Sequence, residues 1–152
     1  MRTLARPRDR AEILERLLAL RPESGRRWGR MSAHQAVCHL VDSFRFAVGE
    51  RPAHAAPGLL GRTVIKWVAL YAPMRWPAGI TTAPEVDSER GGTPPADFAY
   101  DLADLAGLIE RFAAEPRRLD DLVHPVFGRM SEPAWHRWGW LHADHHLRQF
   151  GA

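Results

Sequence analysis

The chain of 152 residues has a single cysteine, Cys38, so no disulfide can form within it. A lone cysteine is typical of a reducing compartment, and we expect a cytoplasmic protein. No apolar run is long enough to cross a membrane, because the longest, near residues 64–74, is interrupted by Lys66 and Pro73. The sequence also lacks a glycine-rich phosphate loop and a Ser-His-Asp signature. These absences exclude a disulfide scaffold, a membrane-spanning protein and the commonest nucleotide-binding motifs.

Lysine is almost absent as well, since Lys66 is the only one and arginine supplies the other basic charges. The formal net charge is only +3 at pH 7, and basic clusters such as Arg26-Arg27 and Arg117-Arg118 are short. Nucleic-acid binding requires a larger basic surface. We therefore expect no nucleic-acid and no membrane partner, but a small-molecule substrate, for which the charge allows a modest preference for anions.

The composition fits one globular domain over residues 1–152, with 45% apolar and 26% charged residues. Apolar residues recur at helical spacing and no segment alternates as a strand does, which predicts an all-α fold. Ser32 followed by Gln35 is a capping-box pattern at the start of the second helix, and Ser131 stands where it would cap the last. We expect a short helix at 58–71 and four long helices at 8–21, 32–49, 96–114 and 131–149.

Three histidines crowd into the last predicted helix. His142 and His146 are four residues apart, so both rings leave one helix face and can hold one metal ion. His39, in the second helix, is the best candidate for a third ligand. Three neutral imidazoles leave an open coordination position, where the pKa of bound water falls to about 7 in favourable zinc sites. Such a site suits hydrolysis or the activation of a thiol.

Small residues near the proposed ligands leave room for the rings, in particular Ser43 beside His39 and Gly139 one turn before the pair. We expect three large aromatic residues, Trp135, Trp138 and Phe44, to be buried in the core.

Other assignments of these histidines stay open on spacing alone. Exposed pairs four residues apart are common on helices without any metal. Cys38 can replace His39 as a ligand, although the two side chains point about 100° apart and cannot easily serve together. His145 can replace His146 through its spacing of three from His142, or lie beside the site. His124 is expected in a loop, and the surface histidines are expected to be His34, His54 and His136.

Two segments far apart in the sequence carry motifs that contain the proposed ligands. The first is Trp28-Gly-Arg-Met-Ser-Ala-His-Gln, followed by His39, and the second is His142-x-x-x-His146-x-x-Gln149-Phe150, preceded by His124-Pro-Val-Phe-Gly. In these motifs the chain resembles the DinB/YfiT-like superfamily of metal-binding four-helix bundles. It resembles more closely an uncharacterised branch, a domain of unknown function.

The resemblance implies a DinB-like four-helix bundle with up-down-down-up order and a long crossover carrying a short extra helix. It also implies a divalent metal on His39, His142 and His146, which can be zinc, nickel, iron or manganese, with zinc favoured. Characterised members include S-transferases and isomerases that use low-molecular-weight thiols, and others are annotated hydrolases. Many relatives have His-Arg-Gly-Gln where this chain has His146-Leu-Arg-Gln149, so thiol transfer is one option beside hydrolysis.

Two alternatives to an enzyme remain, a non-catalytic metal-binding or dimerising stress-response domain, and a metal-free protein whose histidines only form hydrogen bonds. A homodimer is left open. We expect Gln149 and His145 to assist catalysis from beside the metal ligands, and Arg148 to attract an anionic group. The irregular stretch 73–95, with five prolines and three glycines, should cover the site through Arg75-Trp76-Pro77 and Gly79-Ile80-Thr81.

Overall fold

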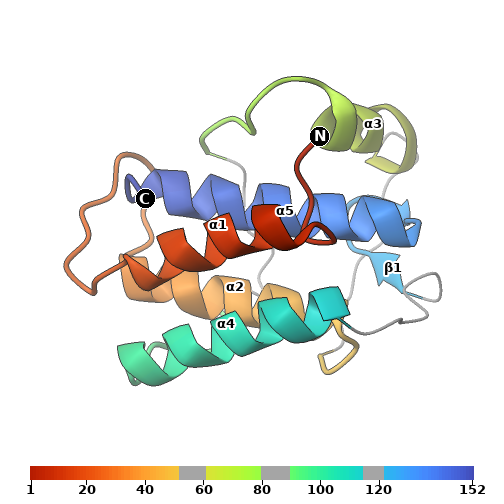
Figure 1. Cartoon of the computed structure of the whole chain (residues 1–152). Helices are drawn as coiled ribbons and strands as arrows, with labels where there is room; N and C mark the ends of the chain where they lie inside the picture. The colour runs from red at the N-terminus through yellow and green to blue at the C-terminus, as the bar shows by residue number, and fades with distance from the viewer. Residues whose placement is uncertain (52–60, 80–89, 115–121) are drawn as a thin grey trace.

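Four long helices lie side by side and enclose the apolar core in the computed structural model of the chain (Figure 1). The structure describes residues 1–51, 61–79, 90–114 and 122–152. The elements are α1 (Pro7–Leu18), α2 (Ala33–Ala47), the π-helical turn η1 (Gly61–Ile65), α3 (Lys66–Tyr71), α4 (Phe98–Ala114), β1 (Val123–His124), β2 (Gly128–Arg129) and α5 (Glu132–Gln149). The expected all-α class is confirmed, apart from one very short hairpin.

Helices α1 and α5 run parallel, although they are the first and last of the chain. The backbone of Leu4, just before α1, donates a hydrogen bond to the carbonyl of His136 near the start of α5. Toward the C-terminal ends of both helices, Arg16 of α1 forms an ion pair with Asp144 of α5 at 2.9 Å. Both helices therefore advance in the same direction.

Helices α2 and α4 also run parallel to each other. His34 bonds to Asp101 at their N-terminal ends, and the rings of Phe44 and Phe112 pack 5.4 Å apart at their C-terminal ends. Helices in this relation cannot be joined by a tight turn. The chain between them must instead return along the length of the bundle, which explains the long crossover.

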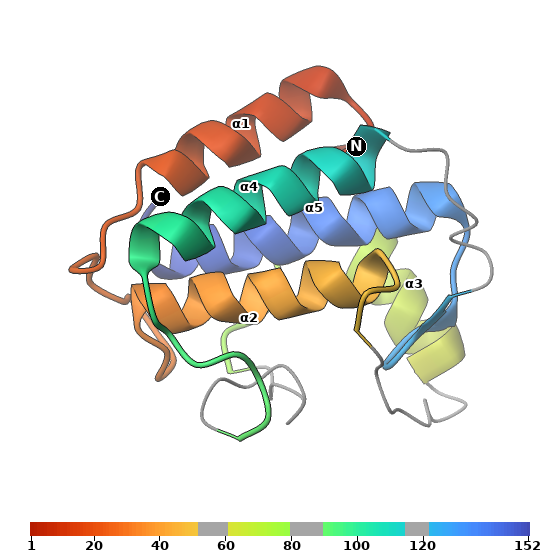
Figure 2. The same ribbon diagram turned by 90° about the horizontal axis from the view of Figure 1, so that it is seen from below.

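Helices α2 and α5 run antiparallel, which completes the up-down-down-up order expected from the sequence. Phe46 near the end of α2 packs against Trp135 near the start of α5, whereas His39 meets His142 further along α5. Each long helix thus has two long neighbours, as Figure 2 shows from below.

The core contains the aromatic residues that the sequence placed there. Phe44 and Trp135 are fully buried, and Trp138 is 3% exposed. The ring centroids of Phe44 and Trp138 lie 5.8 Å apart, so large apolar side chains hold α2 and α5 together next to His142.

The crossover is fixed to α2 by a buried carboxylate. Asp42, fully buried on α2, accepts two hydrogen bonds of 2.7 Å from the backbone and hydroxyl of Thr93, and it pairs with Arg51. Earlier in the crossover, α3 contacts α5, where Arg137 donates a hydrogen bond to the carbonyl of Leu70. Both contacts hold the crossover against the bundle.

Several local expectations needed correction. The first helix ends at Leu18 rather than near residue 21, and Leu18 is exposed. The capping box of Ser32 and Gln35 is confirmed, whereas Ser131 occupies the N-cap of α5 without a side-chain bond. The expected loop at residues 124–128 is the turn of the β1–β2 hairpin. The first residues of the helix expected at 58–71 lie outside the described part.

No helix among the described residues combines the length and apolar character needed to span a membrane.

Candidate metal centre

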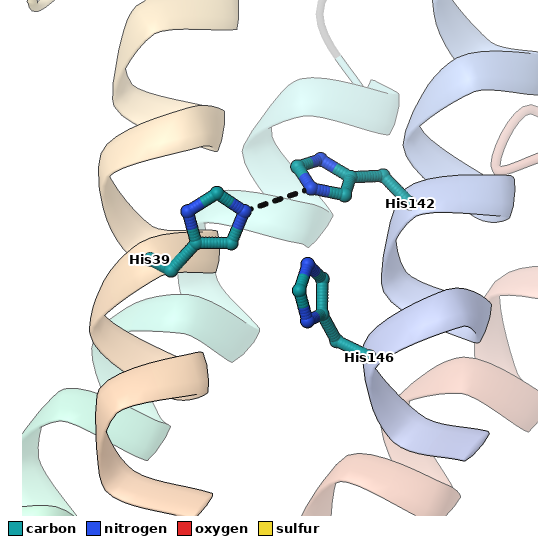
Figure 3. Close-up of side chains that lie close together, drawn as sticks. All are labelled: His39, His142 and His146. Carbon is teal, nitrogen blue, oxygen red and sulfur yellow. Dashed lines mark hydrogen bonds between the residues drawn. The ribbon is translucent and has the colours of Figure 1, made fainter. Parts of the chain in front are cut away.

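The imidazole rings of His39, His142 and His146 point toward one another between α2 and α5 (Figure 3). Nε2 of His39 lies 3.0 Å from Nε2 of His142, and the ring centroids of His39 and His146 are 4.7 Å apart. One ligand nitrogen from each ring lies within 4.8 Å of the other two. The structure thus brings together the three histidines that the sequence singled out.

The local sequence explains this convergence. The capping box starts α2 at Ala33, and the resulting helical phase turns His39 toward α5. On α5, the spacing of four residues stacks His142 and His146 on one face, with ring centroids 5.1 Å apart. Antiparallel packing of the two helices then sets one ring opposite two.

The donor set fits a divalent transition-metal ion. Tetrahedral coordination with metal–nitrogen bonds of about 2.0–2.1 Å separates two ligand nitrogens by about 3.3 Å. The observed 3.0 Å between His39 and His142 needs only a small opening. The donors are three imidazoles, a ligand type that suits zinc, nickel and iron.

The surroundings keep two of the rings neutral. Burial lowers the pKa of His142 and His146 well below the ordinary histidine value, and the neighbouring ring of His39 adds to the effect in both. A neutral imidazole has a lone pair free for a metal, whereas a protonated one has none. Both rings can therefore act as ligands at neutral pH.

Gln149 fixes which ring nitrogen of His146 carries the proton. Its Nε2 donates a 2.9 Å hydrogen bond to the backbone carbonyl of Trp28, which can only accept. Its Oε1 must then face Nδ1 of His146, 3.1 Å away, and Nδ1 must carry the proton. The lone pair of His146 is left on Nε2, the nitrogen directed away from Gln149.

The backbone turn beside Trp28 is shaped to admit this amide. Gly29 adopts a φ of +75°, and a Cβ built there would lie 2.7 Å from Nε2 of Gln149. Glycine is the residue that tolerates both the dihedral angle and the close approach. The segment Trp28-Gly29 and the last turn of α5 therefore form one unit behind His146. Both polar atoms of the Gln149 amide therefore have a hydrogen-bond partner within the protein.

Aromatic rings border the histidines on one side. Trp76 of the crossover lies 6.0 Å from the ring of His142 and 6.1 Å from that of His145, and Trp28 lies 6.0 Å from His145. Of the expected Arg75-Trp76-Pro77 segment, Trp76 therefore lies beside the cluster. Ile80 and Thr81 lie outside the described residues.

His145 is buried beside the three-histidine cluster and does not belong to it. Its ring packs against that of His146, with centroids 5.1 Å apart. Burial lowers the pKa of His145, and nearby Arg148 lowers it further. Arg148 itself bonds to Asp144 at 2.8 Å and lies over the ring of Trp28.

The alternative of Cys38 as a ligand in place of His39 is not what the structure shows. The sulfur of Cys38 faces Asp101 of α4 at 3.5 Å. The 100° turn between consecutive helix residues directs His39 to α5 and Cys38 to α4.

The predicted surface position of His136 was wrong. His136 is 4% exposed and packs against Phe112 of α4, on a helix that also contacts α1, α2 and α3. His34 is half-buried and bonded to Asp101. His54 lies outside the described residues. His124 is buried at the hairpin, where its Nδ1 accepts bonds from two backbone N–H groups.

The sequence predicted that Gly139 leaves space beside the proposed ligands, and this prediction was wrong. A Cβ there would meet Leu4 at 2.8 Å, Phe112 at 3.1 Å and Phe44 at 3.3 Å. The glycine instead allows the core side chains of three other segments to approach α5.

The fold and the buried site together define a four-helix bundle with a three-histidine cluster between its second and last long helices. The chain belongs to the family described as Protein of unknown function (DUF1569), whose model matches residues 5–152. No curated protein and no solved structure matches the chain.

Proposed function

We propose that this protein is a metal-dependent enzyme in which His39, His142 and His146 hold one divalent ion that activates a thiol or water against a small electrophilic substrate. The observation that carries the proposal is the convergence of three rings within 4.8 Å, two of them held neutral by burial. Zinc is favoured over nickel, iron and manganese, because imidazole suits zinc, nickel and iron better than manganese, and zinc is commonly held by three protein ligands with one open position. The same pattern supports a relationship with the DinB/YfiT-like superfamily.

The chain's own residues have three tasks in this proposal. The three imidazoles hold the ion, which supplies the Lewis acidity that makes water or a thiol acidic near neutral pH. Gln149 fixes the tautomer of His146 through Trp28, as a hydrogen-bond partner of a metal ligand commonly does. His145 lies against His146 and would assist from beside the three ligands.

Trp76 and Trp28 supply the apolar border on which a substrate would rest. The ring centroids of Trp28 and Trp76 lie 6.0 and 6.1 Å from that of His145, and Trp76 is fixed by its own hydrogen bond to the carbonyl of Ala69 at 2.7 Å. A small apolar or aromatic electrophile fits such a border. An anionic group reaching Arg148 would have to compete with Asp144.

Elemental analysis followed by an activity screen tests the proposal. Purified protein should retain the metal, and His39→Ala should lose it while His54→Ala does not. Metal-loaded protein is then screened for thiol conjugation and for hydrolysis, before and after chelation. We expect activity that disappears on chelation and in His146→Ala. Activity that survives both treatments would refute the metal mechanism.

A non-catalytic, dimerising metal-binding domain is the second candidate, and the exposed apolar side chains of η1, α3 and the segment after it favour it. Val64, Trp67 and Met74 are 59%, 63% and 57% exposed, and contiguous exposed apolar residues mark interaction surfaces. A metal-loaded protein that is dimeric in solution and inactive throughout the screen would establish this alternative. A monomer with chelation-sensitive activity would exclude it.

A further inference from the structure

A second group of metal-ligating side chains lies between α2 and α4. His34 and Cys38 are four residues apart on α2, so both side chains leave the same face of that helix. Asp101 comes from the first turn of α4. One ligand atom from each of the three lies within 4.8 Å of the other two. The spacing of His34 and Cys38 is visible in the sequence, but the third member, Asp101, comes from another helix and was not predicted.

The group is separate from the three-histidine cluster. Parallel packing of α2 and α4 sets Asp101 opposite His34 and Cys38, whereas His39 faces α5. The two groups therefore occupy different faces of α2 and share no ligand.

The distances fit coordination of one ion. Bonds of about 2.3 Å to sulfur and 2.0–2.2 Å to oxygen place these two atoms about 3.6 Å apart at a tetrahedral centre. The sulfur of Cys38 and Oδ2 of Asp101 are 3.5 Å apart. Nε2 of His34 is 2.7 Å from the same oxygen and must move outward by about 0.7 Å to the tetrahedral spacing. The partial exposure of the His34 side chain leaves room for that movement.

We propose that His34, Cys38 and Asp101 form a second divalent transition-metal site, of the zinc class, which links α2 to α4. A donor set of nitrogen, sulfur and oxygen suits zinc or cobalt and disfavours magnesium and calcium, which prefer oxygen alone. On binding, the sulfur–hydrogen bond of Cys38 breaks, a sulfur–metal bond forms and the proton passes to solvent, with no change of oxidation state.

Without an ion the same side chains form a small hydrogen-bond network. Burial and the facing carboxylate of Asp101 raise the pKa of Cys38 to about 12, so the sulfur is a thiol that donates to Asp101. The ion would take the place of that proton and of the His34–Asp101 hydrogen bond. A network that only ties the two helices together is the competing explanation, and it predicts no bound metal.

Cobalt(II) titration distinguishes the two explanations, because thiolate coordination gives a near-ultraviolet charge-transfer band. Cys38 is the only cysteine of the chain, so any such band reports this residue. For the wild-type chain we expect the band and about two equivalents of cobalt. Cys38→Ser, His34→Ala and Asp101→Asn should each lose the band and one equivalent. His34→Ala is the variant least disturbing to the fold, since its side chain is partly exposed.

His142→Ala serves as the matched variant at the other site. It should keep the band and one equivalent, and this result would hold even if the proposed enzymatic function failed. Absence of the band in the wild-type chain would overturn the proposal. A band that survives in His34→Ala and Asp101→Asn but disappears in His142→Ala would also overturn it, because Cys38 would then belong to the three-histidine cluster.

Discussion

His146 and Gln149, one turn apart near the end of α5, are joined by a hydrogen bond of 3.1 Å from Nδ1 of the ring to Oε1 of the amide. The carbonyl of Trp28 fixes the amide from its other side. Removing this support should weaken metal binding without removing a ligand. For Gln149→Ala we expect a 10–100-fold loss of zinc affinity, measured by competition with a chromophoric chelator.

Gln35→Ala is the matched control for that measurement. Gln35 belongs to the capping box of α2 and bonds to Ser32, so its loss lowers stability, and it is not one of the proposed ligands. Zinc affinity should stay at the wild-type value in this variant. Equal affinities for Gln149→Ala and the wild-type chain would show that the amide does not position His146.

Trp138 joins the two helices that carry the histidines. It is 3% exposed and contacts the rings of Phe44 and His142. Truncation of a buried aromatic residue to alanine typically costs about 3–5 kcal/mol, and we expect this loss for Trp138→Ala in urea unfolding. Trp67→Ala, at an exposed position on α3, should change stability by less than about 0.5 kcal/mol. A loss below about 1 kcal/mol for Trp138→Ala would contradict the described packing of α5.

Gly139 and Gly107 form a matched pair of helical glycines. A Cβ at Gly139 would press on Leu4, Phe112 and Phe44, whereas nothing lies within 4 Å of one at Gly107. Overpacking typically costs about 1–3 kcal/mol, while replacing an unhindered helical glycine gains about 1 kcal/mol. Thermal unfolding should therefore show Gly139→Ala destabilised and Gly107→Ala stabilised. Stabilisation by both would mean that the core at Gly139 is loosely packed.

The structure brings His39, His142 and His146 together, as their positions in the sequence predicted, because helix periodicity fixes the face of each residue. Spacing alone decides that His142 and His146 stack, and the capping box sets the phase of α2. His136 was misplaced for a physical reason. A polar residue in a helix covered by three neighbours has no solvent-facing side, and one-dimensional patterns cannot show how many neighbours a helix has.

The link from Trp28 through Gln149 to His146 was beyond sequence reasoning as well. It depends on the left-handed conformation of Gly29, which brings a carbonyl of a loop to the last turn of a helix about 120 residues away. The motif around Trp28 marked the segment as informative. Its physical role follows only from the three-dimensional contact.

His124 should make the stability of the protein fall in acid. Burial lowers its pKa from 6.5 to about 3, and its Nδ1 accepts two backbone hydrogen bonds that protonation at this nitrogen would break. Between these two pH values the unfolded chain binds the extra proton. The contribution is therefore complete above about pH 6.5 and decreases as the pH falls toward 3.

The expected size is about 2 kcal/mol of unfolding free energy from this residue between pH 7 and pH 5. Other buried histidines add to the slope, so the comparison is with His124→Asn, which keeps an acceptor near Nδ1 and does not titrate. Urea unfolding at the two pH values should give a smaller loss for the variant, by about 2 kcal/mol. Identical pH dependence in both proteins would show that His124 is not neutral in the folded state.

The central claim is that His39, His142 and His146 bind one metal ion through their ring nitrogens. The most direct measurement is a crystal structure of the zinc-loaded protein with anomalous scattering recorded at the zinc edge. We predict an anomalous peak between α2 and α5, about 2.0–2.2 Å from one nitrogen of each of the three rings. Zinc-loaded crystals with no peak at this position, or with the rings of His39 and His142 turned apart, would contradict the account.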